Sequence, residues 1–102
     1  MATRLCALAD LGSSVPLRVE LDEVDVAVVR VGDEVFAIED VCSHADIPLS
    51  EGEVEDCTIE CALHGSRFDL RTGKPTGPPA SRPVPIFPTS VVDGVVYADL
   101  DT

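Results

Sequence analysis

Hydrophobic and polar residues alternate along this chain in short runs separated by turn residues. The clearest example is VDVAVVRVGDEVFAIED, where a valine-rich run over 24–31 and an alternating run over 34–39 flank Gly32-Asp33. Two such runs joined by a short glycine-containing turn predict a β-hairpin. TSVVDGVVYADL repeats the pattern around Asp93-Gly94, so a second hairpin is expected near the end of the chain.

Further strands are predicted at Thr3–Leu8, Leu17–Leu21 and Glu53–Glu60, where β-branched and apolar residues are frequent. Long runs with the 3.6-residue period of helices are lacking. The 102 residues are enough for one domain with one core and too few for two. The pattern therefore predicts a single all-β domain over 1–102, built as a sandwich or small barrel.

Prolines are concentrated in one segment near the end. Six of the eight lie within fourteen residues, at Pro75, Pro78, Pro79, Pro83, Pro85 and Pro88. Because proline has no backbone donor and a fixed φ, this segment is expected to be neither helix nor central strand. It is either a surface connection between strands or, given its position after a cysteine-histidine pair, a stiff lid over that pair.

Charge narrows the range of partners. Seven basic residues against 19 acidic ones give a net charge of −12, which repels nucleic acid and anionic membranes and favours basic protein surfaces. No apolar run approaches the roughly 20 residues of a membrane span, and the N-terminus does not resemble a secretory signal. We therefore predict a cytoplasmic location, where four cysteines are more typical of metal ligands or buried thiols than of disulfides.

The two histidines of the chain each lie close to a cysteine. VCSHADIPL contains Cys42-x-His44, and CALHGSRFDL contains Cys61-x-x-His64. Two thiolates and two imidazoles on two loops are the ligands that a tetrahedral metal ion or a small iron–sulfur cluster requires. Zinc would accept this set, although zinc modules usually place two cysteines in one pair and two histidines in the other. From the residues alone, both zinc and a cluster remain open.

With RFDLRTG and GPPA after the second pair, the sequence resembles the Rieske [2Fe–2S] proteins, and specifically the soluble Rieske-type ferredoxins. The resemblance covers nearly the whole chain. It implies an antiparallel β sandwich or barrel with a base formed by residues 1–40 and 82–102. Two loops within about 41–81 would then form a small cluster-binding subdomain.

The resemblance also implies the ligands of one [2Fe–2S] cluster per chain. Cys42 and Cys61 would bind one iron, and His44 and His64 would bind the other. Neutral imidazoles in place of thiolates remove negative charge, so the centre accepts an electron more readily. Rieske centres lie at about −150 to +300 mV, against about −400 mV for plant-type clusters.

Neighbouring positions indicate where in this range the protein falls. High-potential members have a disulfide that braces the two loops, and the matching positions here are Ile47 and Leu63, for which we expect an apolar contact. Those members also have a serine and a tyrosine that donate hydrogen bonds near the cluster. Ser66 matches the serine, but Phe68 has no hydroxyl, so we predict a potential in the lower part of the range.

An apolar collar is expected around the histidines, which we place near solvent at one tip of the molecule. The remaining cysteines, Cys6 and Cys57, are predicted to be buried thiols. The residues of the expected collar are Ile47, Pro48, Leu63, Pro78 and Pro79.

No nucleophile with a base, further histidine or phosphate-binding loop accompanies the two pairs, so we predict an electron carrier and not an enzyme. The resemblance implies that it passes electrons from a flavin-dependent NAD(P)H reductase to the terminal oxygenase of an aromatic ring-hydroxylating system. One alternative is the same cluster serving another redox system, such as a monooxygenase or iron–sulfur assembly. Another is a zinc-stabilised interaction domain.

Overall fold

The computed structural model describes residues 2–43, 47–62, 65–77 and 82–100. Its strands form three sheets, and every pairing between named strands is antiparallel. Sheet A has the order β1 (Ala2–Ala7), β10 (Val95–Asp99), β9 (Thr89–Val92). Sheet B has the order β2 (Leu17–Glu20), β3 (Asp25–Val31), β4 (Glu34–Glu39), β8 (Ile86–Phe87). Sheet C has the order β5 (Val54–Glu55), β6 (Thr58–Glu60), β7 (Arg67–Asp69).

Both predicted hairpins are present. Strands β3 and β4 pair from Val31 opposite Glu34, around a turn in which Gly32 has a φ of 61°. Strands β9 and β10 are joined by Asp93 and Gly94, whose φ angles of 50° and 75° are those of a type I′ turn. The Asp-Gly sequence permits this turn because both residue types tolerate positive φ.

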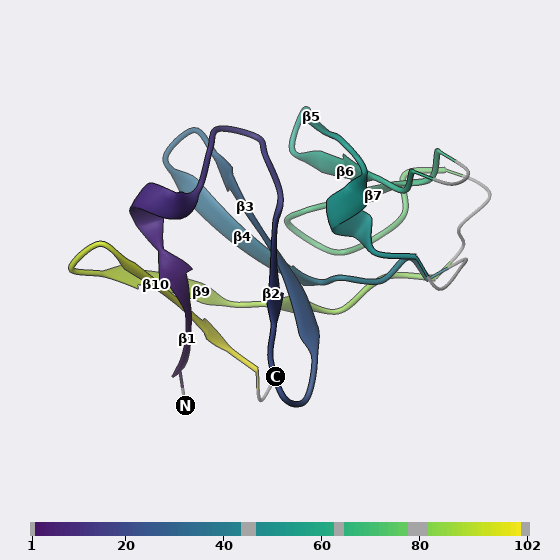
Figure 1. The fold of residues 1–102 in the computed structure, drawn as a ribbon. Coiled ribbons are helices and arrows are strands. Elements are labelled where there is room, and N and C mark those ends of the chain that lie inside the picture. Colours follow the sequence, from purple (N-terminus) through teal and green to yellow (C-terminus); the bar gives the residue numbers. More distant parts are fainter. Residues whose placement is uncertain (1, 44–46, 63–64, 78–81, 101–102) are drawn as a thin grey trace.

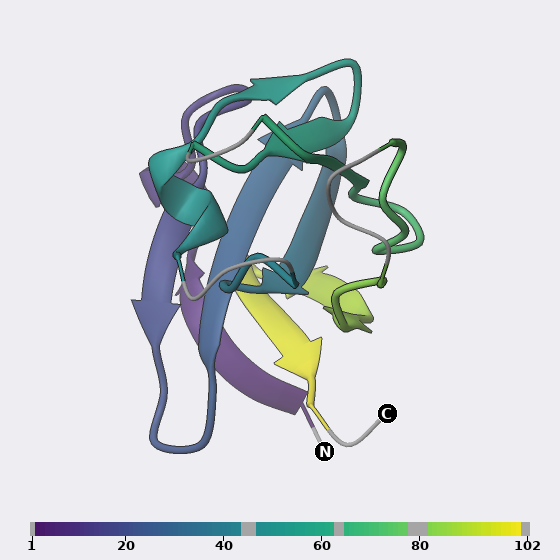
Figure 2. The same ribbon diagram turned by 90° about the vertical axis from the view of Figure 1, so that its right-hand side faces the viewer.

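Sheet B is the middle layer of the molecule, with sheet A on one side and sheet C on the other (Figures 1 and 2). Successive side chains of a strand point to opposite faces. Val26 and Val28 pack in a core shared with sheet A, whereas Ala27 and Val29 pack in a core shared with sheet C. All four are fully buried. The valine-rich run is thus explained by a strand that is covered on both faces.

The strand predicted over Glu53–Glu60 is wrong as a single element. The chain forms β5, turns at Asp56 and Cys57, and returns as β6, with Glu55 opposite Thr58. Both turn residues have positive φ, 51° and 60°, which is the geometry of a type I′ turn without glycine. Here tertiary packing overrides local preference, because the Cys57 side chain is buried in the core beneath the turn.

The described residues of the proline-rich segment form one strand at the edge of a sheet and no helix, in agreement with the expectation. Strand β8 lies between Pro85 and Pro88 and pairs with β4 at the edge of sheet B. Two 3-10 turns, η1 (Leu8–Asp10) and η2 (Leu49–Glu51), complete the helical content of the described residues. No helix in these ranges has the length and apolar character needed to cross a membrane.

Candidate metal centre

The two cysteine-histidine pairs begin on loops that are closed in the same way. In the first loop, residues 42–47, the Cys42 amide donates to the Ile47 carbonyl at 2.9 Å. In the second loop, residues 61–66, the Cys61 amide donates to the Ser66 carbonyl at 2.6 Å. The first loop leaves sheet B after β4, and the second connects β6 to β7 in sheet C. Each cysteine therefore stands at the base of a loop closed five residues later.

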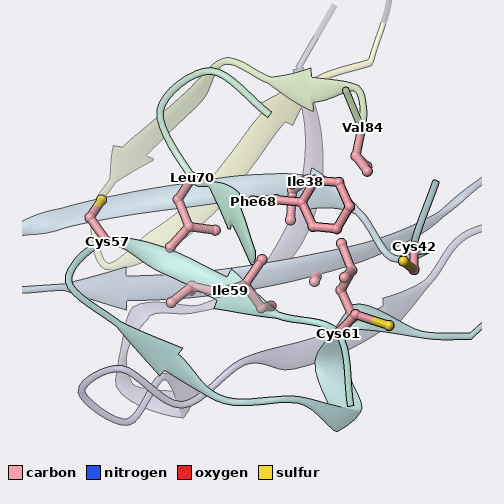
Figure 3. Close-up of a cluster of buried hydrophobic side chains, with 11 residues drawn as sticks. Ile38, Cys42, Cys57, Ile59, Cys61, Phe68, Leu70 and Val84 are labelled. Carbon is pink, nitrogen blue, oxygen red and sulfur yellow. The ribbon is translucent and has the colours of Figure 1, made fainter. Parts of the chain in front are cut away.

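Both cysteines contribute to the core between sheets B and C. Cys42 is 3% exposed and Cys61 is fully buried. Figure 3 shows their sulfur atoms at the same end of this core, on the side of Val84. Thiolates held in an apolar, water-poor site are suited to a soft metal centre, since water does not compete for the ligand positions. The two thiol donors among the described residues therefore fit the predicted cluster.

Several predicted site residues lie outside the described residues: His44, His64, Leu63 and Pro78, together with Pro79 of the expected collar. The expected apolar contact between Ile47 and Leu63 stays a prediction for this reason. Ile47 itself is partly buried and packs against the core that contains both cysteines.

Ser66 and Phe68 also line this region. Ser66 is almost fully buried at the closing hydrogen bond of the second loop. Phe68 is fully buried, and its ring lies beside Ile38, on the side of the core where Val84 and Cys42 lie (Figure 3). The ring supplies apolar contact next to the cysteines where a tyrosine would bring a hydroxyl.

Asp40, which the sequence reasoning missed, links the two ends of the first loop. Its side chain has no exposed surface and accepts hydrogen bonds from Arg18 Nη1 at 2.9 Å, the Ser50 amide at 2.7 Å and Ser50 Oγ at 2.6 Å. Asp40 precedes Cys42 by two residues, and Ser50 lies in η2 just after the loop. The interaction also raises the pKa of the Arg18 guanidinium, chiefly through the hydrogen bond to Asp40. Asp40 thus fixes where the first loop begins and ends.

Replacing Asp40 with alanine is expected to destabilise the protein by about 2–4 kcal/mol, because Arg18 and Ser50 lose a buried charged acceptor. Iron should also be released faster to a chelator. Asp25→Ala is the matched control: Asp25 binds the same arginine at 2.8 Å but is 42% exposed, so about 1 kcal/mol or less is expected. Denaturant unfolding measures both, and equal losses in the two variants would contradict the role given to Asp40.

The other two cysteines, Cys6 and Cys57, are buried, as predicted. Cys6 lies in the core between sheets A and B, away from the loops. Cys57 belongs to the core between sheets B and C, but it sits at the β5–β6 turn, at the far end from Cys42 and Cys61 in Figure 3. Burial raises the pKa of the Cys57 thiol, while Arg71 opposes the shift, so the thiol is favoured over the thiolate that metals bind.

The described ends of the proline-rich segment contact β7, which follows the second loop, and the core that contains both cysteines. The Thr76 amide donates to the carbonyl of Arg67, which begins β7 at the end of the second loop. The Val84 amide donates to the Gly73 carbonyl, and the Val84 side chain packs in the same core as Cys42 and Cys61. Residues 78–81, between these ends, lie outside the described residues, so the lid over the second pair stays a prediction.

A layered antiparallel β fold with two buried cysteines in one core, each at the base of a closed loop, can supply two thiolate ligands to one metal centre. Residues 2–88 match the family model of the Rieske [2Fe-2S] domain. The chain is 51% identical over 75 residues to the anthranilate 1,2-dioxygenase ferredoxin subunit of Burkholderia cepacia, which covers 74% of this chain and 69% of that protein.

Two solved structures are also similar. The ferredoxin of carbazole 1,9a-dioxygenase from Nocardioides aromaticivorans IC177 superposes with a TM-score of 0.92 at 38% identity, over 96% of each chain. A chain in a complex of reduced oxygenase and oxidized ferredoxin of carbazole 1,9a-dioxygenase gives a TM-score of 0.90 at 37% identity, over 95% of this chain and 91% of that one.

This chain belongs to the Rieske [2Fe-2S] domain family. It is a Rieske ferredoxin that binds a [2Fe–2S] cluster and serves as an electron-transfer component, not as an enzyme. The antiparallel β fold and the cluster predicted from the sequence are thereby confirmed.

Proposed function

We propose that Cys42 and Cys61 bind one iron of the cluster and that His44 and His64 bind the other. The burial of both cysteines in one core supports this assignment. When bound, the cluster supplies transfer of single electrons. The protein's own residues hold the two loops by their closing hydrogen bonds and exclude water from the thiolate side with Ile38, Phe68 and Val84. The division into a base (1–40 and 82–102) and a cluster-binding region (about 41–81) is part of this proposal.

The partners follow from the family. This chain accepts electrons from a flavin-dependent NAD(P)H reductase and delivers them to the terminal oxygenase of an aromatic ring-hydroxylating system. The observation that carries the oxygenase assignment is the similarity to a ferredoxin whose structure is described as a complex with its oxygenase. The similarity to a dioxygenase ferredoxin subunit supports it. A cytoplasmic location, in which metal ligands and buried thiols are the typical roles of cysteine, completes the proposal.

Protein purified from anaerobic, iron-replete growth is expected to contain acid-labile sulfide and to give, after reduction, a rhombic EPR spectrum with an average g below 2. A midpoint below about 0 mV is expected, since Phe68 offers no hydroxyl to the cluster. Redox titration measures it, and a value well above that would contradict the argument from Phe68.

Electron delivery is tested separately, by reconstitution with a reductase and an oxygenase of this class. Substrate-dependent turnover that requires this chain supports the partner assignment. If the protein gives the EPR spectrum of a Rieske centre but supports no turnover by such an oxygenase, the partner assignment is refuted. The proposed ligand set would still stand.

A further inference from the structure

We propose that Ser43 and Arg82 form a staple that positions the first loop and raises the reduction potential of the centre. The two residues are 39 positions apart in the chain and are joined by reciprocal hydrogen bonds. The inference rests on the proposed function, because Ser43 stands between Cys42 and His44, two of the proposed ligands.

The staple consists of one strong and one longer hydrogen bond. Ser43 Oγ donates to the backbone carbonyl of Arg82 at 2.6 Å, and Arg82 Nη2 donates to the backbone carbonyl of Ser43 at 3.3 Å. Each residue therefore offers a side-chain donor to the main chain of the other. This reciprocity fixes the separation of the two backbones as well as the direction of the arginine side chain.

Among the described residues, the staple acts one residue beyond the contacts that hold the base of the loop. The Cys42–Ile47 hydrogen bond and the Asp40–Ser50 contacts hold the base of the first loop. Ser43 lies one residue beyond this base and directly precedes His44. Arg82 in turn precedes Val84 by two residues, and Val84 is buried in the core with both cysteines. The loop is thus tied to a segment that is itself anchored in the core.

The guanidinium group also brings positive charge to the first loop. Arg18 and Arg67 each lie within 3 Å of a carboxylate, which offsets their charge. In the contact described for Arg82, the acceptor is the neutral Ser43 carbonyl, one peptide unit from Cys42. Reduction adds one negative charge to the centre, so a nearby cation stabilises the reduced state more than the oxidised one. Removing this charge should therefore lower the midpoint potential.

Two substitutions separate the charge from the hydrogen bond of the hydroxyl. Arg82→Gln removes the charge and should shift the reduction equilibrium about threefold toward the oxidised state, which is a fall of about 30 mV for one electron. The difference from wild type should shrink as salt is raised, because the arginine is exposed. Ser43→Ala keeps the charge and should leave the midpoint nearly unchanged, but it should release iron to a chelator faster than wild type.

Lys74→Gln is the matched control, since it removes one positive charge from an exposed residue in the turn after β7. Lys74→Gln should leave the iron release rate unchanged and should shift the midpoint potential only slightly. Arg82→Lys keeps the charge but not the planar donor group. Its midpoint potential should therefore stay close to that of wild type, while iron should be released to a chelator somewhat faster. This variant and Ser43→Ala also keep the test valid if Arg82→Gln does not fold.

The measurements are redox titration and chelator kinetics on the cluster-containing proteins. Suppose that wild type shows the Rieske EPR spectrum, and that Ser43→Ala and Arg82→Gln have the midpoint potential and the iron release rate of wild type. The staple is then refuted, while the proposed function stands. A fall in midpoint of equal size in Lys74→Gln would likewise refute the specific role of Arg82. Wild-type protein without sulfide or EPR signal would instead refute the ligand assignment.

Discussion

Cys61→Ser is expected to yield protein without the cluster, with iron and acid-labile sulfide at background and no EPR signal after reduction. Cys61 is fully buried at the base of the second loop. A serine oxygen is a harder and far less acidic ligand than a thiol, so it does not replace the thiolate on iron. Cys42→Ser should behave in the same way, because Cys42 stands at the equivalent position of the first loop.

Cys57→Ser and Cys6→Ser are the controls for this experiment. Both positions are buried cysteines, so the chemical change and its cost to packing are comparable. Neither lies on a loop that carries a cysteine-histidine pair, and both variants should keep wild-type sulfide content per folded chain. Loss of the cluster in Cys57→Ser would show that this thiol, four residues before Cys61, belongs to the ligand set.

Gly73→Ala is expected to destabilise the protein by more than about 3 kcal/mol. The residue has a φ of 77°, which alone costs an alanine about 1 kcal/mol. A Cβ atom at this position would lie 2.0 Å from the Val84 carbonyl oxygen, so the backbone of the proline-rich segment must move away. That movement would break the hydrogen bond from the Val84 amide to Gly73 and withdraw Val84 from the core beside the cysteines.

Gly32→Ala separates the two contributions to this loss. Gly32 has a similar φ of 61°, but nothing lies within 4 Å of an added Cβ. Its substitution should therefore cost only about 1 kcal/mol. Thermal unfolding of the cluster-containing proteins, followed by circular dichroism, gives both values. Equal destabilisation of the two variants would mean that the close approach of Gly73 to Val84 has no energetic weight.

The features that the sequence predicted well are those determined by neighbouring residues. The Gly32-Asp33 and Asp93-Gly94 turns need only residues that tolerate positive φ between two strand-forming runs, so both hairpins could be located from local pattern. Cys42 and Cys61 were singled out because thiol and imidazole side chains at close spacing have few other uses, and the structure places both in one core. Their role as ligands stays a proposal.

The features that could not be predicted depend on residues distant in the chain. The Asp56-Cys57 turn contains no glycine, and it forms because the rest of sheet C holds it and buries the cysteine. Asp40 looks like one more surface carboxylate in an acidic segment until folding brings Arg18 and Ser50 to it. In the same way, the close approach of Gly73 to Val84 is decided by the path of the proline-rich segment, which no local pattern specifies.

Because β3 is buried on both faces, it contributes to two cores, and only one of them contains Cys42 and Cys61. The core between sheets A and B contains neither Cys42 nor Cys61, and the hydrogen bonds of the central hairpin need no metal. Most of the β framework can thus form on a nascent chain in a cell short of iron. Iron and sulfide would then be needed only at the end of the other core, the end that holds Cys42 and Cys61.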